Sequence, residues 1–227
     1  RTDVSLNPMD DGCPSWSGFG EAKNHADFTG IAAALLPADG GGAEPFWMLA
    51  ARTLFVETCI KLIKDGQATN QALASRLMMA DLKEVHKMLE NTVADPLTAP
   101  EAAKMAESIR AVFNTNAQAL RFLPEDKEPF SIQTWIRNDD KPGSILFITS
   151  SHNELVLNRA LLSLWMNLAV HTLMRLPRTR SLRTWFFFDE VHALHRLPAI
   201  EDGLQTARGF GGAFVLGCLA AQPVKAA

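Results

Sequence analysis

Three short apolar runs in the second half of the chain, separated from one another by helical patterns, constrain the fold more than any other feature. They cover residues 145–149, 185–188 and 213–216, are rich in β-branched or aromatic residues, and are apolar on both faces. Such runs are typical of strands buried on both sides of a sheet. Because strands that alternate with helices indicate a parallel sheet with helices on its faces, the sequence predicts an α/β fold. A fourth run of this kind covers residues 4–6.

A helical segment separates the first of these runs from the second. Residues 7–144 are far more than one crossover connection needs. Residues 46–63 have apolar side chains at helical spacing, and residues 65–123 contain helix starts and stops without a strand signal. We therefore predict an α/β domain formed by residues 1–64 and 124–227, with an inserted all-α lobe at residues 65–123.

The predicted lobe carries two candidate helix starts. Asp81 with Glu84, and Thr98 with Glu101, have the cap-plus-three spacing at which side chains satisfy free N–H groups; Pro96 interrupts between them. The lobe has six Lys/Arg against seven Asp/Glu, so its charge is nearly balanced. This balance favours a protein-binding or packing surface over a phosphate-binding one.

Charge and composition exclude several classes of protein. The chain is 47% hydrophobic and 21% charged, which is globular composition, and its net charge of −3 provides no general attraction for nucleic acid. Any DNA contact must be local, and Arg178, Arg180 and Arg183 form the one small basic cluster that we consider for it, although most such clusters are simply solvated.

Neither disulfides nor a membrane span is indicated. Cys13, Cys59 and Cys218 are widely spaced and form no C-x-x-C pair, so we expect reduced thiols in a cytoplasmic compartment. The longest apolar stretch, residues 155–176, is interrupted by polar residues and has one apolar helical stripe. This pattern predicts a core helix and no transmembrane segment.

Two acids follow the strand at residues 185–188. An apolar strand that ends in Asp189 and Glu190 fits a Walker B motif, in which the first acid holds the Mg²⁺ shell and the second activates the attacking water. The alternative is that these acids merely cap the helix that follows.

Arg208 lies with glycines 209, 211 and 212 directly before the last strand. An arginine there can reach the γ-phosphate held by a neighbouring subunit and stabilise charge in the transition state. Alternatively, it complements the negative end of the preceding helix.

Two other patterns near these acids are weaker. His192 and His195 are three residues apart, but without H-E-x-x-H or a cysteine pair they do not indicate a zinc site. The letters D-E-V-H from Asp189 also spell a motif of DExH helicases. Both nucleotide-hydrolysing interpretations need a G-x-x-x-x-G-K-[ST] loop, which this sequence lacks; glycines 40–42 are not followed by Lys-Ser or Lys-Thr.

Several segments, in order, resemble the motor domain of type IV coupling proteins of the TraD branch. The segments are DVSLNPMD with WSGF, PFWMLAARTLF, AESIRAVFNTNAQALRFL, PFSIQTWI, SILFITSS, WFFFDEVHALHRLP and ARGFGGAFVLG. DExH helicases share only the four letters.

The resemblance implies a RecA-like P-loop motor that forms a homo-hexamer on the cytoplasmic face of the bacterial inner membrane. Such motors use ATP and Mg²⁺ to drive relaxase-bound single-stranded DNA into a type IV secretion channel. Carried over by residue, Asp189 is the Mg²⁺ acid through water, Glu190 the catalytic base and Arg208 the arginine finger. The helical lobe corresponds to one that meets relaxosome proteins or DNA.

Two departures from the family pattern lead to further expectations. The family's membrane helices and phosphate loop precede the matching region, so we expect an internal fragment that is inactive alone. The family continues the last strand as Gly, an aliphatic residue and Gln-Ser, whereas here Leu219 stands where that Gln is expected and Gln222 follows three residues later. The alternatives for function are a non-catalytic helical binding module for relaxosome proteins and a fragment of a DExH-type helicase.

Overall fold

The computed structural model describes residues 3–37, 45–137, 143–190 and 198–217, and this part of the chain is mostly helical with three small parallel sheets. Each sheet has two strands: β1 (Val4–Leu6) with β4 (Leu146–Ile148), β2 (Ser15–Trp16) with β3 (Pro129–Phe130), and β5 (Thr184–Phe188) with β6 (Gly212–Leu216).

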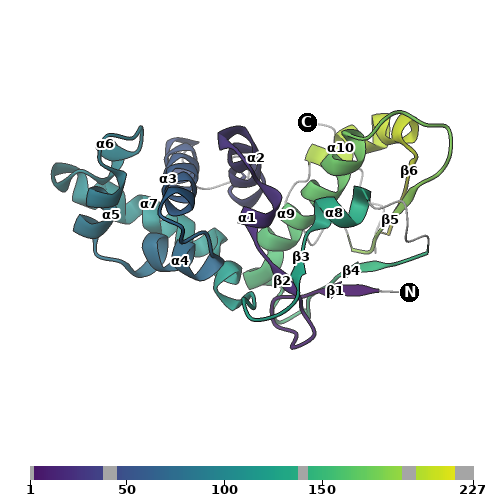
Figure 1. The fold of residues 1–227 in the computed structure, drawn as a ribbon, viewed down its shortest axis with the longest axis horizontal. Coiled ribbons are helices and arrows are strands. Elements are labelled where there is room, and N and C mark those ends of the chain that lie inside the picture. The colour runs from purple at the N-terminus through teal and green to yellow at the C-terminus, as the bar shows by residue number, and fades with distance from the viewer. Residues whose placement is uncertain (1–2, 38–44, 138–142, 191–197, 218–227) are drawn as a thin grey trace.

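The described residues form α-helices and shorter π- and 3₁₀ helices along the whole chain. They are α1 (Gly18–Glu21), α2 (His25–Leu35), α3 (Pro45–Lys64), α4 (Asn70–Ala74), the π-helix η1 (Ser75–Met79), α5 (Leu82–Leu89), α6 (Asp95–Thr98), the 3₁₀ helix η2 (Pro100–Ala102), α7 (Ala103–Asn116), the 3₁₀ helix η3 (Gln118–Phe122), α8 (Ile132–Arg137), α9 (Leu155–Met174), α10 (Pro198–Thr206) and the 3₁₀ helix η5 (Ala207–Phe210). Figure 1 shows α3 to α7 gathered at one end of the molecule, whereas β1, β4, β5 and β6 lie at the other end together with α8, α9 and α10.

The four strands predicted from apolar runs are confirmed as β1, β4, β5 and β6, and each pair among them is parallel. The predicted helices at residues 46–63 and 155–176 are confirmed as α3 and α9. Strands β2 and β3 were not predicted, because two residues are too few to show a period of two. The structure supports a mixed fold with parallel pairs, but the described strands form separate two-stranded sheets.

The prediction that these strands are buried on both faces is wrong for β4 and β6, where Phe147 is 48% and Val215 42% exposed, and most clearly for β5. Phe186 and Phe188 are buried and stack against Phe214 of β6, whereas Trp185 is 54% and Phe187 69% exposed. Helices α9 and α10 cover the inner face, where a Cβ on Gly203 would lie only 2.8 Å from the Phe214 ring. No described segment covers the other face, so side chains alternate between core and solvent.

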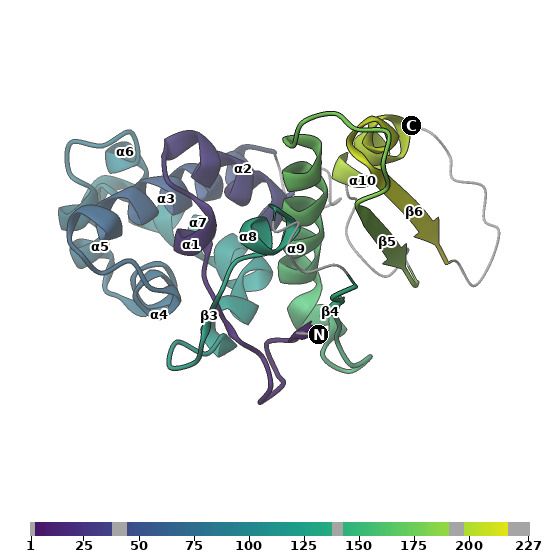
Figure 2. The same cartoon turned by 45° about the vertical axis from the view of Figure 1, so that its right-hand side comes forward.

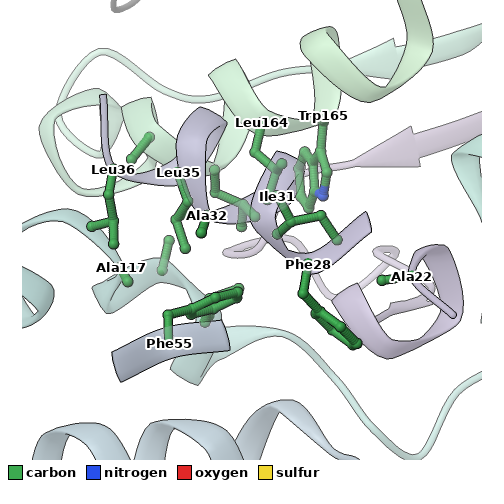
Figure 3. Close-up of a cluster of buried hydrophobic side chains, with 14 of the residues drawn as sticks. Ala22, Phe28, Ile31, Ala32, Leu35, Leu36, Phe55, Ala117, Leu164 and Trp165 are labelled. Carbon is green, nitrogen blue, oxygen red and sulfur yellow. The ribbon is translucent and has the colours of Figure 1, made fainter. Parts of the chain in front are cut away.

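The hydrophobic core lies where α2 packs between α3 and α9. In Figure 3, α2 side chains point toward Phe55 of α3 on one side and toward Leu164 and Trp165 of α9 on the other. Trp165 is fully buried and makes an edge contact with Trp16, with ring centroids 5.6 Å apart. Helix α9 is therefore the core helix that its apolar stripe predicts. Among the described helices, none has both the length and the apolar character needed to cross a membrane.

The segment predicted as an all-α lobe is helical throughout, and α3 also packs against its α5 and α7. Asp81 caps α5 as predicted, accepting a hydrogen bond of 2.8 Å from the Lys83 amide. The second predicted cap is wrong, because Thr98 is the last residue of α6 and its hydroxyl donates to the Asp95 carbonyl. Pro96 is the second residue of that helix, since proline fits the first helical turn, where its missing N–H costs nothing.

Glu21 ties together the two chain segments that lead into and out of the helical region. Its carboxylate is 4% exposed and accepts hydrogen bonds from Trp16 Nε1 at 2.9 Å and from the Ile132 amide at 2.6 Å. The Gln133 amide and the Ser131 hydroxyl donate to its other oxygen. Burial raises the pKa of Glu21, and the hydrogen bonds oppose this rise without cancelling it.

Two of the three cysteines lie within the described residues. Cys13 and Cys59 carry free, buried thiols, as predicted. Burial raises the pKa of both thiols, which keeps them protonated and unreactive. Cys218 lies outside the described residues.

Candidate functional site

Asp189 and Glu190 follow β5 directly, and both side chains are exposed. The apolar strand, anchored by Phe186 and Phe188, ends here, so the carboxylates emerge at the carboxyl edge of a parallel pair, where open α/β sheets place ligands. Glu190 has a φ of 52°, in the left-handed region that few non-glycine residues occupy. Such backbone strain is found most often at functional sites.

Gly217 brings the end of β6 against Asp189. Its amide donates a 2.6 Å hydrogen bond to the Phe188 carbonyl. A Cβ at this position would lie 2.9 Å from Asp189 Oδ1 and 3.4 Å from the Phe188 carbonyl oxygen. Only glycine allows this approach without a shift, which the sequence pattern had not revealed.

We expect Gly217→Ala to lower the free energy of unfolding by about 1 kcal/mol, because the added methyl group displaces the Asp189 carboxylate or separates the two strand ends. Urea denaturation measures this change. Gly30→Ala is the matched control: it lies inside α2, where a Cβ meets nothing within 4 Å. It should stabilise the helix by about 1 kcal/mol. A Gly217→Ala protein as stable as the unaltered chain would contradict the contact with Asp189.

Arg208 does not lie beside these acids. It belongs to η5, which precedes β6, and β6 runs parallel to β5. Arg208 is therefore at the amino end of the pair and the acids at the carboxyl end, separated by five strand residues, or about 17 Å. Figure 2 shows the arrowheads of β5 and β6 pointing the same way, with the loop from α9 to β5 at the opposite end of the sheet.

The candidate DNA-contacting arginines lie at this amino end too, in the loop from α9 to β5. The Thr179 amide donates to the Gly209 carbonyl at 3.0 Å, and the Arg183 amide to the Gly211 carbonyl at 2.7 Å. The Arg178 guanidinium lies over the Phe210 ring, 5.5 Å from its centroid. The fold thus brings Arg178, Arg180 and Arg183 close to η5 and Arg208, a grouping that the sequence analysis did not predict.

The acids at the carboxyl edge fit one kind of metal ion. The described residues contain no group of three or more His, Cys, Asp or Glu side chains that could enclose a metal. Mg²⁺ in nucleotide sites needs few protein carboxylates, because waters and phosphate oxygens complete its shell. Two exposed carboxylates, with glycine backbone closely packed beside Asp189, suit such an ion. His192, His195, Leu219 and Gln222 lie outside the described residues.

Comparison with known proteins identifies clear relatives. A family model for the type IV secretion-system coupling protein DNA-binding domain matches residues 1–227. The chain is 33% identical over 220 residues to the coupling protein TraD of Escherichia coli (strain K12), covering 95% of this chain and 30% of that protein.

Solved structures of similar proteins agree with this match. The unbound monoclinic form of the bacterial conjugative coupling protein TrwBdeltaN70 superposes with a TM-score of 0.84 at 30% identity, over 96% of this chain and 51% of that one. The plasmid coupling protein TrwB in complex with ADP and Mg²⁺ gives the same score and identity, over 95% and 52%. The chain thus spans about half the length of these structures.

Proposed function

Because this chain belongs to the type IV secretion-system coupling proteins, we propose that it forms part of a conjugative motor that uses ATP hydrolysis to drive relaxase-bound single-stranded DNA into a secretion channel. The observation that carries this proposal is the pair Asp189 and Glu190 at the carboxyl end of β5, packed beside Gly217. The related TrwB binds ADP with Mg²⁺ and a non-hydrolysable ATP analogue.

We propose that residues 1–64 and 124–227 belong to one RecA-like P-loop domain and residues 65–123 to its all-α insertion. Two features support this arrangement. Helix α9 joins β4 to β5, and α10 with η5 joins β5 to β6, as in a parallel sheet with helical crossovers. The similarity to TrwB extends over nearly the whole chain, so it includes both parts.

We assign the site residues by their position at the strand ends. Asp189 would hold Mg²⁺ through a water molecule, and the bound ion would supply positive charge beside the phosphates of ATP. Glu190 accepts a proton from the attacking water and orients it. Arg208, at the other end of the sheet, reaches the γ-phosphate of ATP bound to the neighbouring subunit of a homo-hexamer. A ring of head-to-tail contacts provides this geometry.

Partners and location follow from the same assignment. We propose that the intact protein lies on the cytoplasmic face of the inner membrane and contacts the relaxase, other relaxosome proteins and the secretion channel. These remain proposals, because the chain spans only 30% of the length of TraD.

A second candidate function is a helical binding module for a relaxosome protein. It is favoured by a hollow of about 430 Å³ on the lobe, lined by Gln67, Thr69, Ala72, Ser75 and Arg76. Part of its wall belongs to the π-helix η1, a kind of helix often found at functional sites. Titrating the lobe with relaxosome proteins and with single-stranded DNA tests this function; binding to neither would reject it.

We expect the purified chain of 227 residues to show no ATP turnover, because it lacks the phosphate-loop lysine and the backbone cradle for the phosphates. Phosphate release from ATP measures this directly. The whole coupling protein that carries this chain together with a phosphate loop is the positive control and should hydrolyse ATP. Turnover by the isolated chain that disappears in Glu190→Gln would contradict the expectation.

A further inference from the structure

We infer that the arginines ahead of β5 face a second copy of this chain, where they contact the edge that holds the nucleotide, and do not contact DNA. Arg178, Arg180, Arg183 and Arg208 together form what we call the arginine edge. The inference rests on the proposed function, since it assumes that Arg208 acts on the nucleotide of a neighbouring subunit. It assigns Arg178, Arg180 and Arg183 to the same subunit contact as Arg208. The ligand of this basic loop is then a neighbouring subunit and not DNA.

The arginine edge is one connected structural unit. Two backbone hydrogen bonds, from Thr179 to Gly209 and from Arg183 to Gly211, join the loop to the segment that carries Arg208. Gly211, with a φ of 83°, is so close to this loop that a Cβ would lie 2.5 Å from the Ser181 carbonyl oxygen. The Arg178 guanidinium over the Phe210 ring adds a further contact. A neighbour that meets Arg208 must therefore meet this loop as well.

The charge of the arginine edge favours an anionic partner. Residues 175–188 contain four arginines and no acid. Arg178, Arg180, Arg183 and Arg208 are all exposed, and within the described part of the chain neither the Arg180 nor the Arg208 guanidinium has a hydrogen-bond or ion-pair partner. Like charges gathered in this way repel one another and attract an anion.

The opposite end of the same sheet offers the complementary charge. Asp189 and Glu190 are exposed there, without an ion pair among the described residues, and the nucleotide phosphates are proposed to bind beside them. Two ends of one sheet, about 17 Å apart, cannot meet within one copy. In a ring of head-to-tail copies, the arginine edge of one copy meets the acidic edge of the next.

Exposed apolar side chains favour a protein partner over DNA. Leu182 lies among these arginines and is 53% exposed, and Trp185, the second residue of β5, is 54% exposed. A phosphate backbone gives an exposed leucine nothing to pack against. Tryptophan and arginine are enriched among the residues that dominate binding at protein interfaces. Because an exposed tryptophan can also stack on a base of single-stranded DNA, Leu182 is the side chain that favours a protein partner.

A mixing experiment tests the inference in the whole coupling protein. We expect Arg178→Glu with Arg180→Glu to lower ATP turnover at least about tenfold, because it places acids against the neighbour's acidic edge. Glu190→Gln should be inactive by itself, because it removes the proposed catalytic base. Mixing the two variants equally should restore about a quarter of the normal turnover, since a quarter of the contacts then join intact arginines to an intact acidic edge.

A charge reversal on a distant helix is the control for this experiment. Lys83→Glu with Lys87→Glu reverses two exposed charges on α5, far from the sheet, and should leave turnover unchanged. Arginine variants with normal turnover would overturn the inference. So would weakened binding of a single-stranded oligonucleotide together with no recovery on mixing, which is the result expected of a DNA contact.

Self-association separates failure of this inference from failure of the proposed function. A whole protein that does not hydrolyse ATP at all contradicts the motor function alone. Sedimentation velocity at low salt then decides the inference: the arginine variants should lose the association that the unaltered protein shows. Equal association of both proteins, or none by either, overturns it.

Discussion

Arg208→Ala is expected to lower ATP turnover by the whole coupling protein by about 10³-fold or more, which is the effect of removing an arginine that stabilises a transferring phosphoryl group. The Arg208 side chain is exposed and has no partner among the described residues, so its loss leaves no buried group unsatisfied. The variant should therefore fold normally. Steady-state phosphate release measures turnover, and circular dichroism checks the fold.

Two further variants sharpen this prediction. Arg208→Lys should recover only part of the activity, because a lysine ammonium is a point charge without the planar fork of a guanidinium. Arg137→Ala removes another exposed arginine, at the end of α8, whose guanidinium donates a hydrogen bond to the Gln133 side chain. It should leave turnover unchanged. Activity of Arg208→Ala above about a tenth of normal would exclude the arginine-finger assignment.

Long elements of this fold were predictable from the sequence, whereas the contacts between distant segments were not. Helices α3 and α9 each span 20 residues, enough for an apolar stripe to repeat several times. Strand β5 is recognisable because its apolar run ends at two acids, and β6 is recognisable because its apolar run begins directly after glycines. Strands β2 and β3 have two residues each, and their pairing joins positions more than a hundred residues apart.

The candidate site was predicted as a set of residues but not as a geometry. The pattern predicts Asp189, Glu190 and Arg208 as site residues, but it does not reveal that the loop at residues 177–183 lies beside Arg208. That grouping depends on hydrogen bonds to Gly209 and Gly211, which leave no periodic mark in a sequence. Exposure of Trp185 and Phe187 was not predictable either, because alternate aromatic residues look the same on a covered and an uncovered face.

Glu21 carries the second large effect that we expect, on stability. Glu21→Ala should lower the free energy of unfolding by about 3 kcal/mol, because it leaves the Trp16 indole N–H and the Ile132 amide buried without acceptors. Glu21→Gln should cost about 2 kcal/mol, since its amide group places a donor against the donating Gln133 amide or Ser131 hydroxyl. Urea denaturation measures both. Glu107→Gln, on the exposed face of α7, is the control and should change little.

The pH dependence of the free energy of unfolding distinguishes the effect of the Glu21 charge from the effect of the side chain's shape. Because burial raises the pKa of Glu21 in the folded protein, protonation favours the fold: its contribution is complete below the ordinary pKa of 4.5 and declines as the pH rises through the folded pKa. Glutamine does not titrate, so the stability difference between the unaltered protein and Glu21→Gln should be largest below pH 4.5 and shrink above it. Other carboxyl groups are common to both proteins and cancel in this difference. A difference that instead grows with rising pH would show that the hydrogen bonds to the ionised carboxylate outweigh its burial, and that Glu21 holds the two segments together as an anion.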